Sequence, residues 1–380
     1  MSLSRFRKTS RGRIDHWLLL AVLALVGFGL IMISSSSVVL ASQYYGSNYY
    51  FVTHQAVNVL IGLVGLTTFA VIDYHIWQQK AGWIAGAIVF LLILTHIPGI
   101  GVAVKGAQRW IAFGPIQFQP SEVVKLLSVL YLAAWLTARK EYISSFARGF
   151  FPFIVLLGVI GLLILLQRDA GTALVTIGAA VVMYFVAGAP WTHLLTGAVI
   201  GITAFGALIL SAPYRMERFL VFLNPGKETL GAAYHINQAL LAIGAGGLLG
   251  LGFGQSKQKF LYLPEPHTDS IFAIMIEELG FLRSILVVGV LLFVIYRGYR
   301  IAKLAPDEYG RLVAVGVTSL ITVQMVTNIG AMLGVLPLTG VTLPFISYGG
   351  SSLVALLCGV GLLLNISRRT NIAVSAKKAA

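Results

Sequence analysis

Long apolar runs alternate with short polar segments along the whole 380-residue chain. Ten of these runs approach the length of about 20 residues that an α-helix needs to cross the hydrocarbon core of a bilayer. They lack the alternation of apolar and polar positions that marks a β-strand, and backbone groups in lipid must be paired internally, so the runs predict helices. The ten expected spans are residues 17–38, 53–72, 81–97, 121–137, 150–166, 170–186, 193–212, 269–296, 312–333 and 351–366.

The polar segments divide the chain into one membrane domain and two basic tails. We expect an all-α polytopic membrane protein whose domain covers residues 17–366, with basic tails at 1–16 and 367–380, of which about 1–13 and 369–380 are expected to be disordered. The longest interruption, residues 213–268, predicts a large outer loop, and the spacing from Tyr234 to Ile243 predicts an amphipathic helix along the membrane interface. The apolar pattern shows no clear internal repeat, so it does not support an inverted-repeat transporter.

Composition and charge agree with a membrane protein and disfavour other classes. Hydrophobic residues make up 58% of the chain and charged residues 11%, whereas soluble domains are about 25% charged. The net charge of +14 comes from basic residues dispersed between the spans, which suits a membrane surface and gives no reason to expect nucleic acid binding. Lys and Arg concentrate in the tails and in alternate short loops, and this bias predicts that both termini are cytoplasmic.

The segment of residues 105–125 carries polar residues that need a reason in a membrane protein: Lys105, Arg109, Trp110, Glu122 and Lys125. Its glycines and prolines predict a shaped loop that ends where the fourth span begins. The acid and the last lysine are three residues apart on one helical face and can form an ion pair. Two readings stay open for the cations of the loop. They snorkel beside an aromatic anchor at the interface, or they bind a diphosphate together with a helix N-terminus.

Two further polar features have a structural and a functional reading. Asp169 lies in a tight turn between the fifth and sixth spans. It is a suitable N-cap for the sixth helix, and an acid that faces a shared cavity is the alternative. The basic run from Ser256 to Lys259 either faces an anionic substrate or is solvated.

The stretch from Leu263 to Gly280 concentrates acids in a chain that otherwise avoids charge. Two prolines predict an extended approach to the eighth helix. We expect Thr268 to cap this helix and Asp269 to lie in its first turn, at the membrane surface, where the helix dipole favours an acid.

Glu277 and Glu278 fall deeper in the same predicted helix. In a regular helix, Glu277 lies about 12 Å below Asp269 and about 80° round the axis, and Glu278 lies on roughly the opposite side. The three acids therefore cannot share one small site. An ionisable group within a membrane is functional or paired by default, so the glutamates either act directly or pair with Lys125, Arg283 or a backbone group.

The segment of residues 336–352 contains prolines and glycines beside three serines, Ser347, Ser351 and Ser352. Irregular backbone at membrane depth must be buried in protein or line a cavity, so the segment predicts a re-entrant loop packed within the protein. The serines have no nucleophile elbow and no obvious His–Asp partners, which argues against a serine hydrolase.

The polar motifs lie at Gln108–Trp110, Gln119–Lys125, Asp169–Thr172, Leu263–Asp269, Glu277–Gly280 and Pro344–Ser352. In this order and combination they resemble the SEDS family (shape, elongation, division and sporulation), the group of FtsW and RodA. Residues 256–259, 262–267 and 338–344 look more like the FtsW branch than like RodA. Three residues depart from the family's pattern: Ser270 where Phe is more frequent, Arg168 where Pro is common, and Arg283 within the eighth span.

The resemblance implies a ten-span peptidoglycan glycosyltransferase that polymerises lipid II on the outer face of the bacterial cytoplasmic (inner) membrane. By the match at the His-Thr-Asp motif, Asp269 would be the catalytic acidic residue and would act as the general base. Arg109, Lys105 and Lys125 would stabilise the leaving diphosphate. The other residues expected to bind substrate are Glu122, Asp169, His267, Ser347 and Ser351, and those expected in a supporting role are Trp110, Glu277 and Glu278.

The resemblance also implies partners, namely a class B penicillin-binding protein (a monofunctional transpeptidase) and other divisome proteins, at the division septum. A divalent cation, Mg²⁺ or Mn²⁺, could share the stabilisation of the leaving group, although no local ligand spacing demands one. A lipid II flippase is the competing hypothesis and predicts functional acids along a path through the bilayer. A scaffold for the division machinery is the third. Asp269, Arg109 and Lys105 facing one outer cavity would favour polymerisation over flipping.

Overall fold

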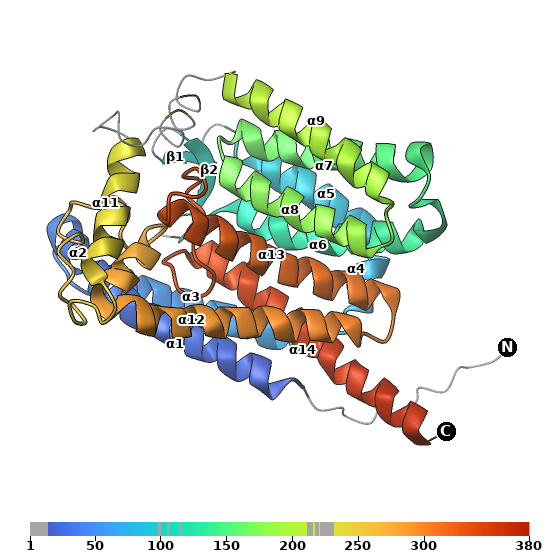
Figure 1. Cartoon of the computed structure of the whole chain (residues 1–380). Helices are drawn as coiled ribbons and strands as arrows, with labels where there is room; N and C mark the ends of the chain where they lie inside the picture. Colours follow the sequence, from blue (N-terminus) through green and yellow to red (C-terminus); the bar gives the residue numbers. More distant parts are fainter. Residues whose placement is uncertain are drawn as a thin grey trace.

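The computed structural model describes residues 14–97, 100–104, 107–113, 116–210, 216, 220 and 232–379. Within these ranges the chain is mainly helical, and its long helices lie side by side in a bundle (Figure 1). The longer helices are α1 (His16–Ser36), α3 (Tyr50–Val71), α5 (Ala81–Leu94), α6 (Pro120–Ala138), α7 (Phe151–Leu166), α8 (Ala170–Val186), α9 (Trp191–Leu210), α11 (Ala232–Gly246), α12 (Ile271–Lys303), α13 (Glu308–Met332) and α14 (Gly350–Ala379). The shorter ones are α2 (Val38–Tyr45), α4 (His75–Gln79), the 3-10 turn η1 (Lys140–Tyr142) and the π-helical turn η2 (Phe146–Phe150).

The predicted fold class is confirmed. Among the described residues, seven helices are long and apolar enough to cross a membrane: α1, α3, α6, α7 with η2, α12, α13 and α14. Three shorter apolar helices, α5, α8 and α9, coincide with the three remaining expected spans. The number of crossings stays a prediction, because length and composition alone identify these helices.

The bundle has a buried centre and a lipid-like periphery. Its central helix, α13, packs against α6, α8, α12 and α14. The most apolar stretch of α13 is 78% buried inside the protein, against 22% for that of α3. α3 directs large apolar side chains such as Leu60 and Val64 outward. Its inner face meets α14 closely, because a Cβ on Gly361 would lie 2.4 Å from the carbonyl oxygen of Leu66. Such close backbone approach at small residues is the usual basis of helix packing in membranes.

Residues 101–118 form a small antiparallel sheet where the sequence predicted an irregular loop. Its strands β1 (Gly101–Val104), β2 (Ala107–Phe113) and β3 (Ile116–Phe118) pair in chain order. Ile111 is opposite Gly101 on one side and Phe118 on the other, and its side chain is fully buried. The sheet leads directly into α6 and therefore sets where the first turn of that helix lies.

α12 consists of two helices joined at Gly280, whereas the sequence predicted a continuous span. Gly280 has φ 80° and ψ 170°, a conformation open to glycine alone without strain. The carbonyls of Glu277 and Glu278 accept hydrogen bonds from N–H groups of segment 247–252, at 2.9 and 3.0 Å. The first two N–H groups after Gly280 donate to carbonyls of the same segment, at 2.9 and 3.2 Å. This segment thus satisfies the backbone groups that a helix break leaves without partners.

The amphipathic helix expected from 234 to 243 is present as α11. Its apolar face packs against α12 and α13 rather than being covered by the membrane interface. Ala233, Ile236, Ala239 and Ala242 form this face and are 0–3% exposed. The helix therefore belongs to the bundle and contributes to the support of the start of α12.

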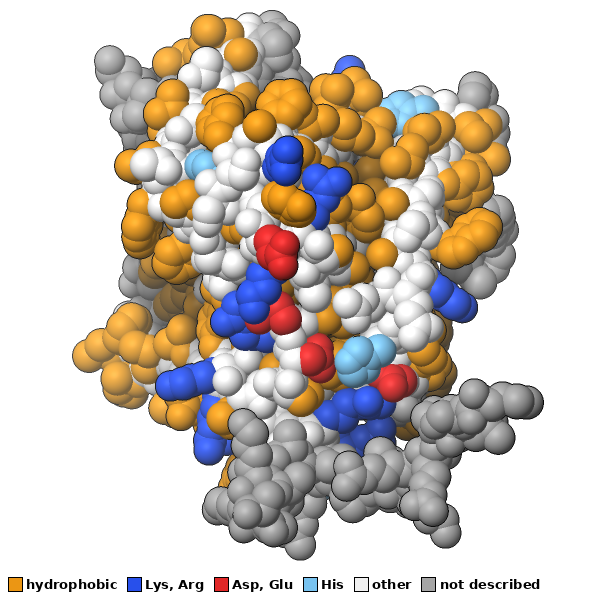
Figure 2. Space-filling view, turned by 90° about the vertical axis from the view of Figure 1, so that its right-hand side faces the viewer, with side chains coloured by type: hydrophobic (Ala, Val, Ile, Leu, Met, Phe, Trp, Pro, Cys, Tyr) orange, Lys and Arg blue, Asp and Glu red, His pale blue; other side chains and the backbone are white. Residues whose placement is uncertain are grey.

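We call the face at which α1 begins and α14 leaves the bundle the terminal end, and the opposite face, with residues 100–119, 247–270 and 335–349, the loop end. Charged side chains gather at the terminal end (Figure 2). Arg297 pairs with Asp15 at 2.5 Å, and Arg369 pairs with Asp73 at 2.8 Å. These pairs join segments that are far apart in the sequence.

The tails differ in part from the expectation. Residues 1–13 lie outside the described residues, so the prediction for them is untested. α14 continues to Ala379, and the prediction of a disordered C-terminal tail is therefore wrong for this segment.

Candidate active site

Asp269 lies in a turn directly before α12 and is partly exposed. The prediction that Thr268 caps the helix is wrong, because α12 begins at Ile271 with Ser270 as its N-cap residue. The N–H groups of Thr268 and Ser270 both donate to the carbonyl of Glu265, each at 3.2 Å. The Thr268 hydroxyl lies 3.1 Å from Oδ1 of Asp269 and 3.0 Å from Oε2 of Glu265. Asp269 is thus carried by a closed turn rather than by a helix.

Asn328 of α13 holds this turn, and the sequence analysis assigned it no role. Its side-chain amide donates to the carbonyl of Asp269 at 2.8 Å and to the carbonyl of Val341 at 2.7 Å. Asn328 is 1% exposed, so the low dielectric strengthens its hydrogen bonds, above all the fully buried one to Val341. A lone asparagine in an apolar span was the signal that could have identified it.

Ser270, one of the departures from the family's pattern, ties the same turn to α11. Its hydroxyl donates to the carbonyl of Pro264 at 2.8 Å. Nε2 of His235 lies 2.6 Å from that hydroxyl. Because a hydroxyl has one proton, Nε2 of His235 must be the donor in this contact. The smaller serine is therefore accommodated by a hydrogen bond between α11 and the turn.

His267 lies on the other side of the turn and is buried. Its ring packs at 4.2 Å between centroids on Phe51 and at 5.4 Å on Tyr348. Its carbonyl accepts a hydrogen bond from the N–H of Tyr348 at 2.8 Å. These contacts fix the turn against α3 and against the segment before α14. Substrate binding by His267 remains a prediction.

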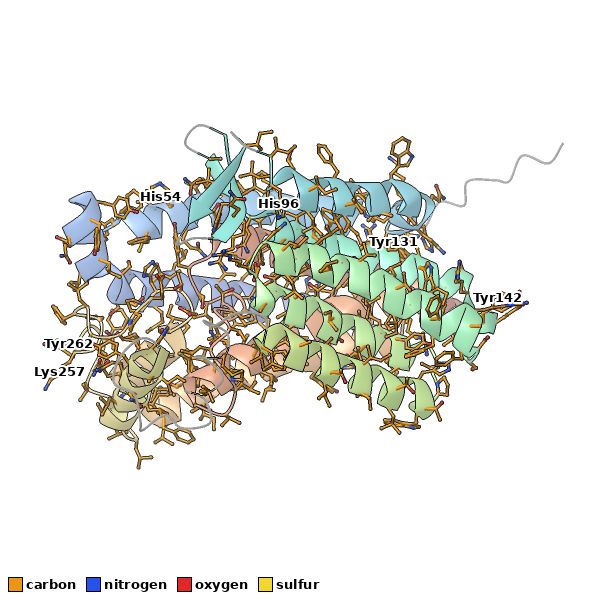
Figure 3. The ribbon with its side chains drawn as sticks, turned by 90° about the horizontal axis from the view of Figure 1, so that it is seen from above. His54, His96, Tyr131, Tyr142, Lys257 and Tyr262 are labelled. Carbon is orange, nitrogen blue, oxygen red and sulfur yellow. The ribbon has the colours of Figure 1, made fainter. Side chains whose placement is uncertain are left out.

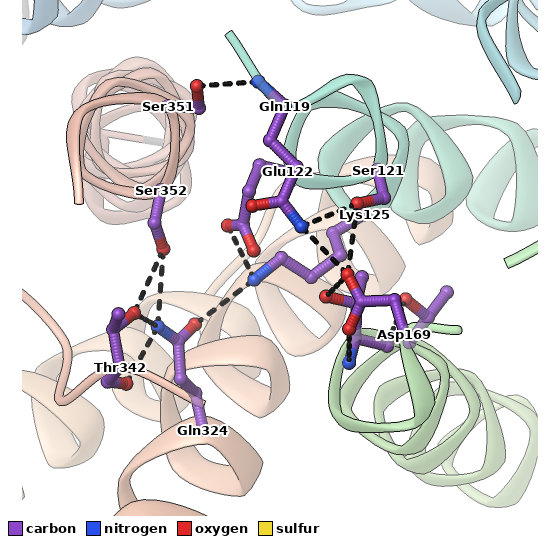
Figure 4. A network of polar contacts seen from close by, with 11 residues as sticks. Gln119, Ser121, Glu122, Lys125, Asp169, Gln324, Thr342, Ser351 and Ser352 are labelled. Carbon is purple, nitrogen blue, oxygen red and sulfur yellow. Dashed lines mark hydrogen bonds and ion pairs between the residues drawn. The ribbon is translucent and has the colours of Figure 1, made fainter. Parts of the chain in front are cut away.

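Asp169 is the N-cap residue of α8, which confirms the structural interpretation of this residue. Its Oδ1 accepts from the N–H of Thr172 at 3.0 Å, and its Oδ2 accepts from the Thr172 hydroxyl at 2.9 Å. The same Oδ2 also accepts from the side-chain amide of Gln119 at 2.7 Å and from Ser121 at 3.3 Å (Figure 4). Asp169 therefore joins α8 to the start of α6, and its carboxylate is enclosed by donors.

Glu122 and Lys125 form the predicted ion pair, at 2.7 Å, and both side chains are about nine-tenths buried or more. Nζ of Lys125 also donates to Oε1 of Gln324 at 3.4 Å. A small cavity of about 10 Å³ lies beside this pair, between α6, α13 and α14. That volume holds about one water molecule, so the pair lies within the helix packing.

The segment of residues 341–352 connects these groups to Asp269. Gln324 donates to the carbonyl of Thr342 at 3.0 Å, and Asn328, one helical turn further along α13, holds the neighbouring carbonyl of Val341. Polar contacts therefore lead from the Asp269 turn through Asn328 to Val341, and from the next residue, Thr342, through Gln324 to Lys125. The prediction of a buried irregular segment here is confirmed, since residues 343–347 are buried.

Two serines of this segment, Ser347 and Ser351, accept hydrogen bonds from backbone N–H groups. The hydroxyl of Ser347 accepts from the N–H of Leu343 at 2.8 Å. The hydroxyl of Ser351 accepts from the N–H of Gln119 at 2.9 Å. Both fix the segment in place, and direct contact of either with substrate remains a prediction.

The cations expected to hold a diphosphate are only partly described. Lys105 lies outside the described residues. Arg109 and Trp110 are half-buried neighbours on β2, so their side chains point to opposite faces of the sheet. Within the described residues Arg109 forms no ion pair, and its buried Nε has no hydrogen-bond partner.

Glu277 and Glu278 are held by the basic segment 256–259; of the expected partners, Lys125 and Arg283 do not reach them, whereas backbone groups do. Nζ of Lys259 pairs with Glu278 at 2.9 Å, with both side chains at most 3% exposed. The hydroxyl of Ser35 donates to the same carboxylate at 2.7 and 2.8 Å. Lys259 is therefore buried, and neither reading of its segment, as solvated or as facing an anionic substrate, applies to it. Lys257 lies at the surface of the loop end (Figure 3).

Glu277 is enclosed in the same way. It accepts from the N–H of Lys257 at 2.9 Å and from the N–H of Gln258 at 3.4 Å, and also from the hydroxyl of Ser256. Arg283 is exposed and donates to the carbonyl of Leu249 at 3.3 Å. The arrangement supports the backbone reading for Glu277 and a buried ion pair for Glu278.

In the part of the chain that the structure describes, no three His, Cys, Asp or Glu residues lie close enough together to hold a metal ion. Because Mg²⁺ is usually held by one or two carboxylates together with substrate phosphates, the expected divalent cation stays a prediction.

Comparisons with known proteins place this geometry in context. The family model described as "Cell cycle protein", for FtsW, RodA and SpoVE, matches residues 16–372. Stage V sporulation protein E of Bacillus subtilis (strain 168) is 43% identical to the chain, covering 95% of this chain and 98% of that protein. A probable peptidoglycan glycosyltransferase FtsW of Geobacter sp. (strain M18) is 38% identical, over 93% and 97% of the two chains.

Solved structures are similar over the same extent. A chain from work on structural coordination of polymerization and crosslinking by a peptidoglycan synthase complex has a TM-score of 0.78 at 30% identity, covering 94% of this chain and 98% of that chain. Rod shape determining protein RodA of Thermus thermophilus has a TM-score of 0.67 at 31% identity, over 93% and 97%.

Proposed function

The chain belongs to the FtsW/RodA/SpoVE family, and from that premise we propose that it is a peptidoglycan glycosyltransferase that polymerises lipid II at its loop end. Asp269 is the catalytic residue in this proposal. The observation that carries it is the set of buried polar side chains, Asn328, Gln324 and Lys125, that links the Asp269 turn to the start of α6 by way of residues 341 and 342. The names of the FtsW relatives support the reaction class.

The proposed reaction is a single inverting displacement. The acceptor hydroxyl oxygen forms a bond to the anomeric carbon of the donor glycan, and the bond from that carbon to the diphosphate oxygen breaks. Asp269 takes the proton of the acceptor hydroxyl as the general base, and the undecaprenyl diphosphate leaves with the electron pair. A half-buried carboxylate on a closed turn suits this task, because it is fixed in position yet keeps surface for substrate.

We assign different roles to the two described cations of the site, Arg109 and Lys125. Arg109 is the described residue that best fits the leaving diphosphate, since it has no ion-pair partner within the described residues and lies on the sheet at the loop end. Lys125 is already neutralised by Glu122 inside the bundle. We therefore assign Lys125 a supporting role through Gln324 rather than direct contact with the phosphate.

The distribution of acids favours polymerisation over flipping. Those of the described residues fall into two groups, one at each end of the bundle. The group at the loop end is Glu122, Asp169, Glu265, Asp269, Glu277 and Glu278, and the group at the terminal end is Asp15, Asp73, Glu141, Asp307 and Glu308. A flippase needs polar groups along the path between the ends, and the middle of the described helices offers no acid for it.

A solved relative supports the proposed partner. That structure comes from work on a complex that coordinates polymerization with crosslinking, so we propose that this chain acts with a transpeptidase of the class B penicillin-binding type. The FtsW and SpoVE relatives support a role in division or sporulation, and we propose the division septum as its site, with both termini in the cytoplasm.

The test is polymerisation of lipid II by the purified chain with its transpeptidase partner. We expect long glycan strands from the unaltered protein and none above background from Asp269→Ala at equal abundance. Strands of normal length from Asp269→Ala would contradict the assignment of Asp269 as the catalytic residue. Transfer of lipid II across vesicles without strand formation by the unaltered protein would favour the flippase.

A further inference from the structure

An apolar groove lies between α5, α6 and α7, in the half of the bundle away from Asp269. Its volume is about 420 Å³, and its lining includes Ala85 and Ile88 of α5, Tyr131 of α6, and Val155 and Val159 of α7. Val155 and Val159 are each 48% exposed, so the groove opens sideways toward the bilayer. Tyr131 lies among these helices, well away from the loop end (Figure 3).

The groove has the length of one leaflet. It extends along α7 from Phe151 to Ile160, which is about 14 Å at 1.5 Å per residue. Half of the hydrocarbon core is about 15 Å. A helix about 10 Å across would need more than roughly 1,000 Å³ over that length, so the groove is too small to enclose a helix and suits an acyl chain.

Cations surround the end of the groove that faces the terminal end. Each of the three groove helices has at least one there: Lys80 is the N-cap of α5, Arg139 and Lys140 follow α6, and Arg148 lies in η2 directly before α7. Lys80, Lys140 and the two arginines are all exposed.

The two arginines are already held in position. The guanidinium of Arg139 lies 4.8 Å from the ring centre of Trp135, and that of Arg148 lies 5.5 Å from Tyr142. Nη1 of Arg139 donates to the carbonyl of Arg148 at 3.4 Å. Stacking of this kind orients a guanidinium while leaving its N–H groups available to a phosphate.

Charge pairing separates these cations from three arginines at the same end. Arg297, Arg311 and Arg369 each pair with a carboxylate of the chain. Among the ion pairs of the described residues none involves Lys80, Arg139, Lys140 or Arg148, and the neighbouring Glu141 takes part in none either. Positive charge that the chain leaves uncompensated therefore collects where the apolar groove begins.

We propose that this groove binds an anionic phospholipid of the leaflet at the terminal end, with an acyl chain between α5 and α7 and the phosphate at Arg139 and Arg148. This site is separate from the proposed glycosyltransferase site, and its ligand is neither donor nor acceptor. Basic pockets between membrane helices are suited to such headgroups. The lipid would brace α7 against α5, helices that leave a groove between them.

Native mass spectrometry of the purified chain titrated with phosphatidylglycerol or phosphatidylcholine tests the proposal. We expect phosphatidylglycerol to bind at least about tenfold more tightly, because each nearby cation contributes roughly fivefold toward an anionic lipid and two arginines lie at the proposed phosphate position. Arg139→Ala with Arg148→Ala should abolish this preference. Arg300→Ala with Lys303→Ala removes the same charge at the same end, from the exposed end of α12, and should leave it unchanged.

Val155→Trp tests the contribution of the groove independently of that of the cations, since the larger side chain fills the groove and leaves the charges unaltered. It should weaken binding of phosphatidylglycerol by at least about tenfold, as expected when an acyl chain loses its apolar contact. Equal binding of the two lipids, an equal loss in the Arg300 and Lys303 variant, or unchanged binding by Val155→Trp would each overturn the proposal. So would a photo-crosslink from position 159 to a protein chain instead of phospholipid. None of these outcomes depends on polymerisation.

Discussion

Asp269 and the pair Glu277 and Glu278 come from one stretch of the chain, yet their surroundings are opposite. The carboxylate of Glu278 is fully buried and meets the ammonium of Lys259 and the hydroxyl of Ser35. Asp269 is partly exposed; its carbonyl accepts a hydrogen bond from Asn328, and the hydroxyl of Thr268 lies 3.1 Å from its Oδ1. A fully buried carboxylate that is paired with an ammonium is fixed as a charge, whereas a partly exposed carboxylate keeps surface that a substrate can reach. The first arrangement serves the fold and the second suits chemistry.

The largest effect should come from Asp269→Asn, which keeps the shape of the side chain and removes its ability to accept a proton. Polymerisation should fall by about 10²–10⁴-fold, the range typical of a lost general base. The thermal midpoint of the purified protein should change little, because Asn328 contacts only the backbone at this position. Initial rates of strand formation, at matched protein concentration, measure the effect.

Glu278→Gln should lower the stability of the protein rather than its catalytic rate. It leaves Lys259 as a buried charge without its carboxylate, and breaking such a pair costs about 3–5 kcal/mol. A second change, Lys259→Met, removes the stranded charge and should recover most of that loss. Thermal unfolding of the two variants measures the difference, and equal stability of the single and the double variant would contradict the buried pair.

Asn328→Asp tests the tie between α13 and the Asp269 turn. It removes both donated hydrogen bonds and puts a negative charge beside two carbonyls, so polymerisation should fall by roughly 10–100-fold, equivalent to about 1–3 kcal/mol. Asn365→Asp is the matched control, because Asn365 is also buried and donates to carbonyls of α3, at the terminal end.

Both asparagine variants should lose stability, and Asn328→Asp alone should lose rate per folded molecule. An equal loss of that rate in both would show that the effect of Asn328 is general. Asn328→Ser, which retains one donor, should recover part of the rate.

The smallest effect should appear at Asp73, in the polar segment between α3 and α4. Burial alone would raise the pKa of this carboxyl, but hydrogen bonds from the N–H and imidazole of His75 and the charge of Arg369 outweigh it and hold the pKa below its usual range. A folded-state pKa below the unfolded value stabilises the fold above about pH 3.9, and this contribution is lost as pH falls through the folded value. Asp73→Asn should therefore lower stability at neutral pH, and the difference should disappear in strong acid.

The size of this effect should stay below about 1 kcal/mol, because the side chain of Asp73 is 40% exposed and water screens its ion pair. Unfolding midpoints of the two proteins across the acidic range measure it. A difference that grows as the pH falls would contradict the sign.

The helices were the predictable part of this fold. A run of apolar residues fixes a membrane helix locally, and several observed ends lie close to those expected, as for α6 at Pro120–Ala138 and α8 at Ala170–Val186, whereas α12 and α14 continue beyond theirs. The sheet at residues 101–118 was missed because its glycines and prolines are typical of loops, and strand pairing depends on partners elsewhere.

The candidate site was predictable in its residues but not in its contacts. Asp169 as an N-cap and the pair of Glu122 and Lys125 follow from spacing along one helix. The partner of Glu278 could not be predicted in this way, because the break at Gly280 and the loop before α12 bring Lys259 to it. Asn328 lacked a role for the same reason, since both of its acceptors are distant in sequence.

The contrast between the two acidic regions is tested most directly by measuring strand formation and thermal unfolding on the same preparations of Asp269→Asn and Glu278→Gln. We predict that Asp269→Asn loses polymerisation with an unchanged midpoint. We predict that Glu278→Gln lowers the midpoint and retains much of its rate per folded molecule. An Asp269→Asn protein that polymerises normally, while folded Glu278→Gln makes no strands, would contradict the account.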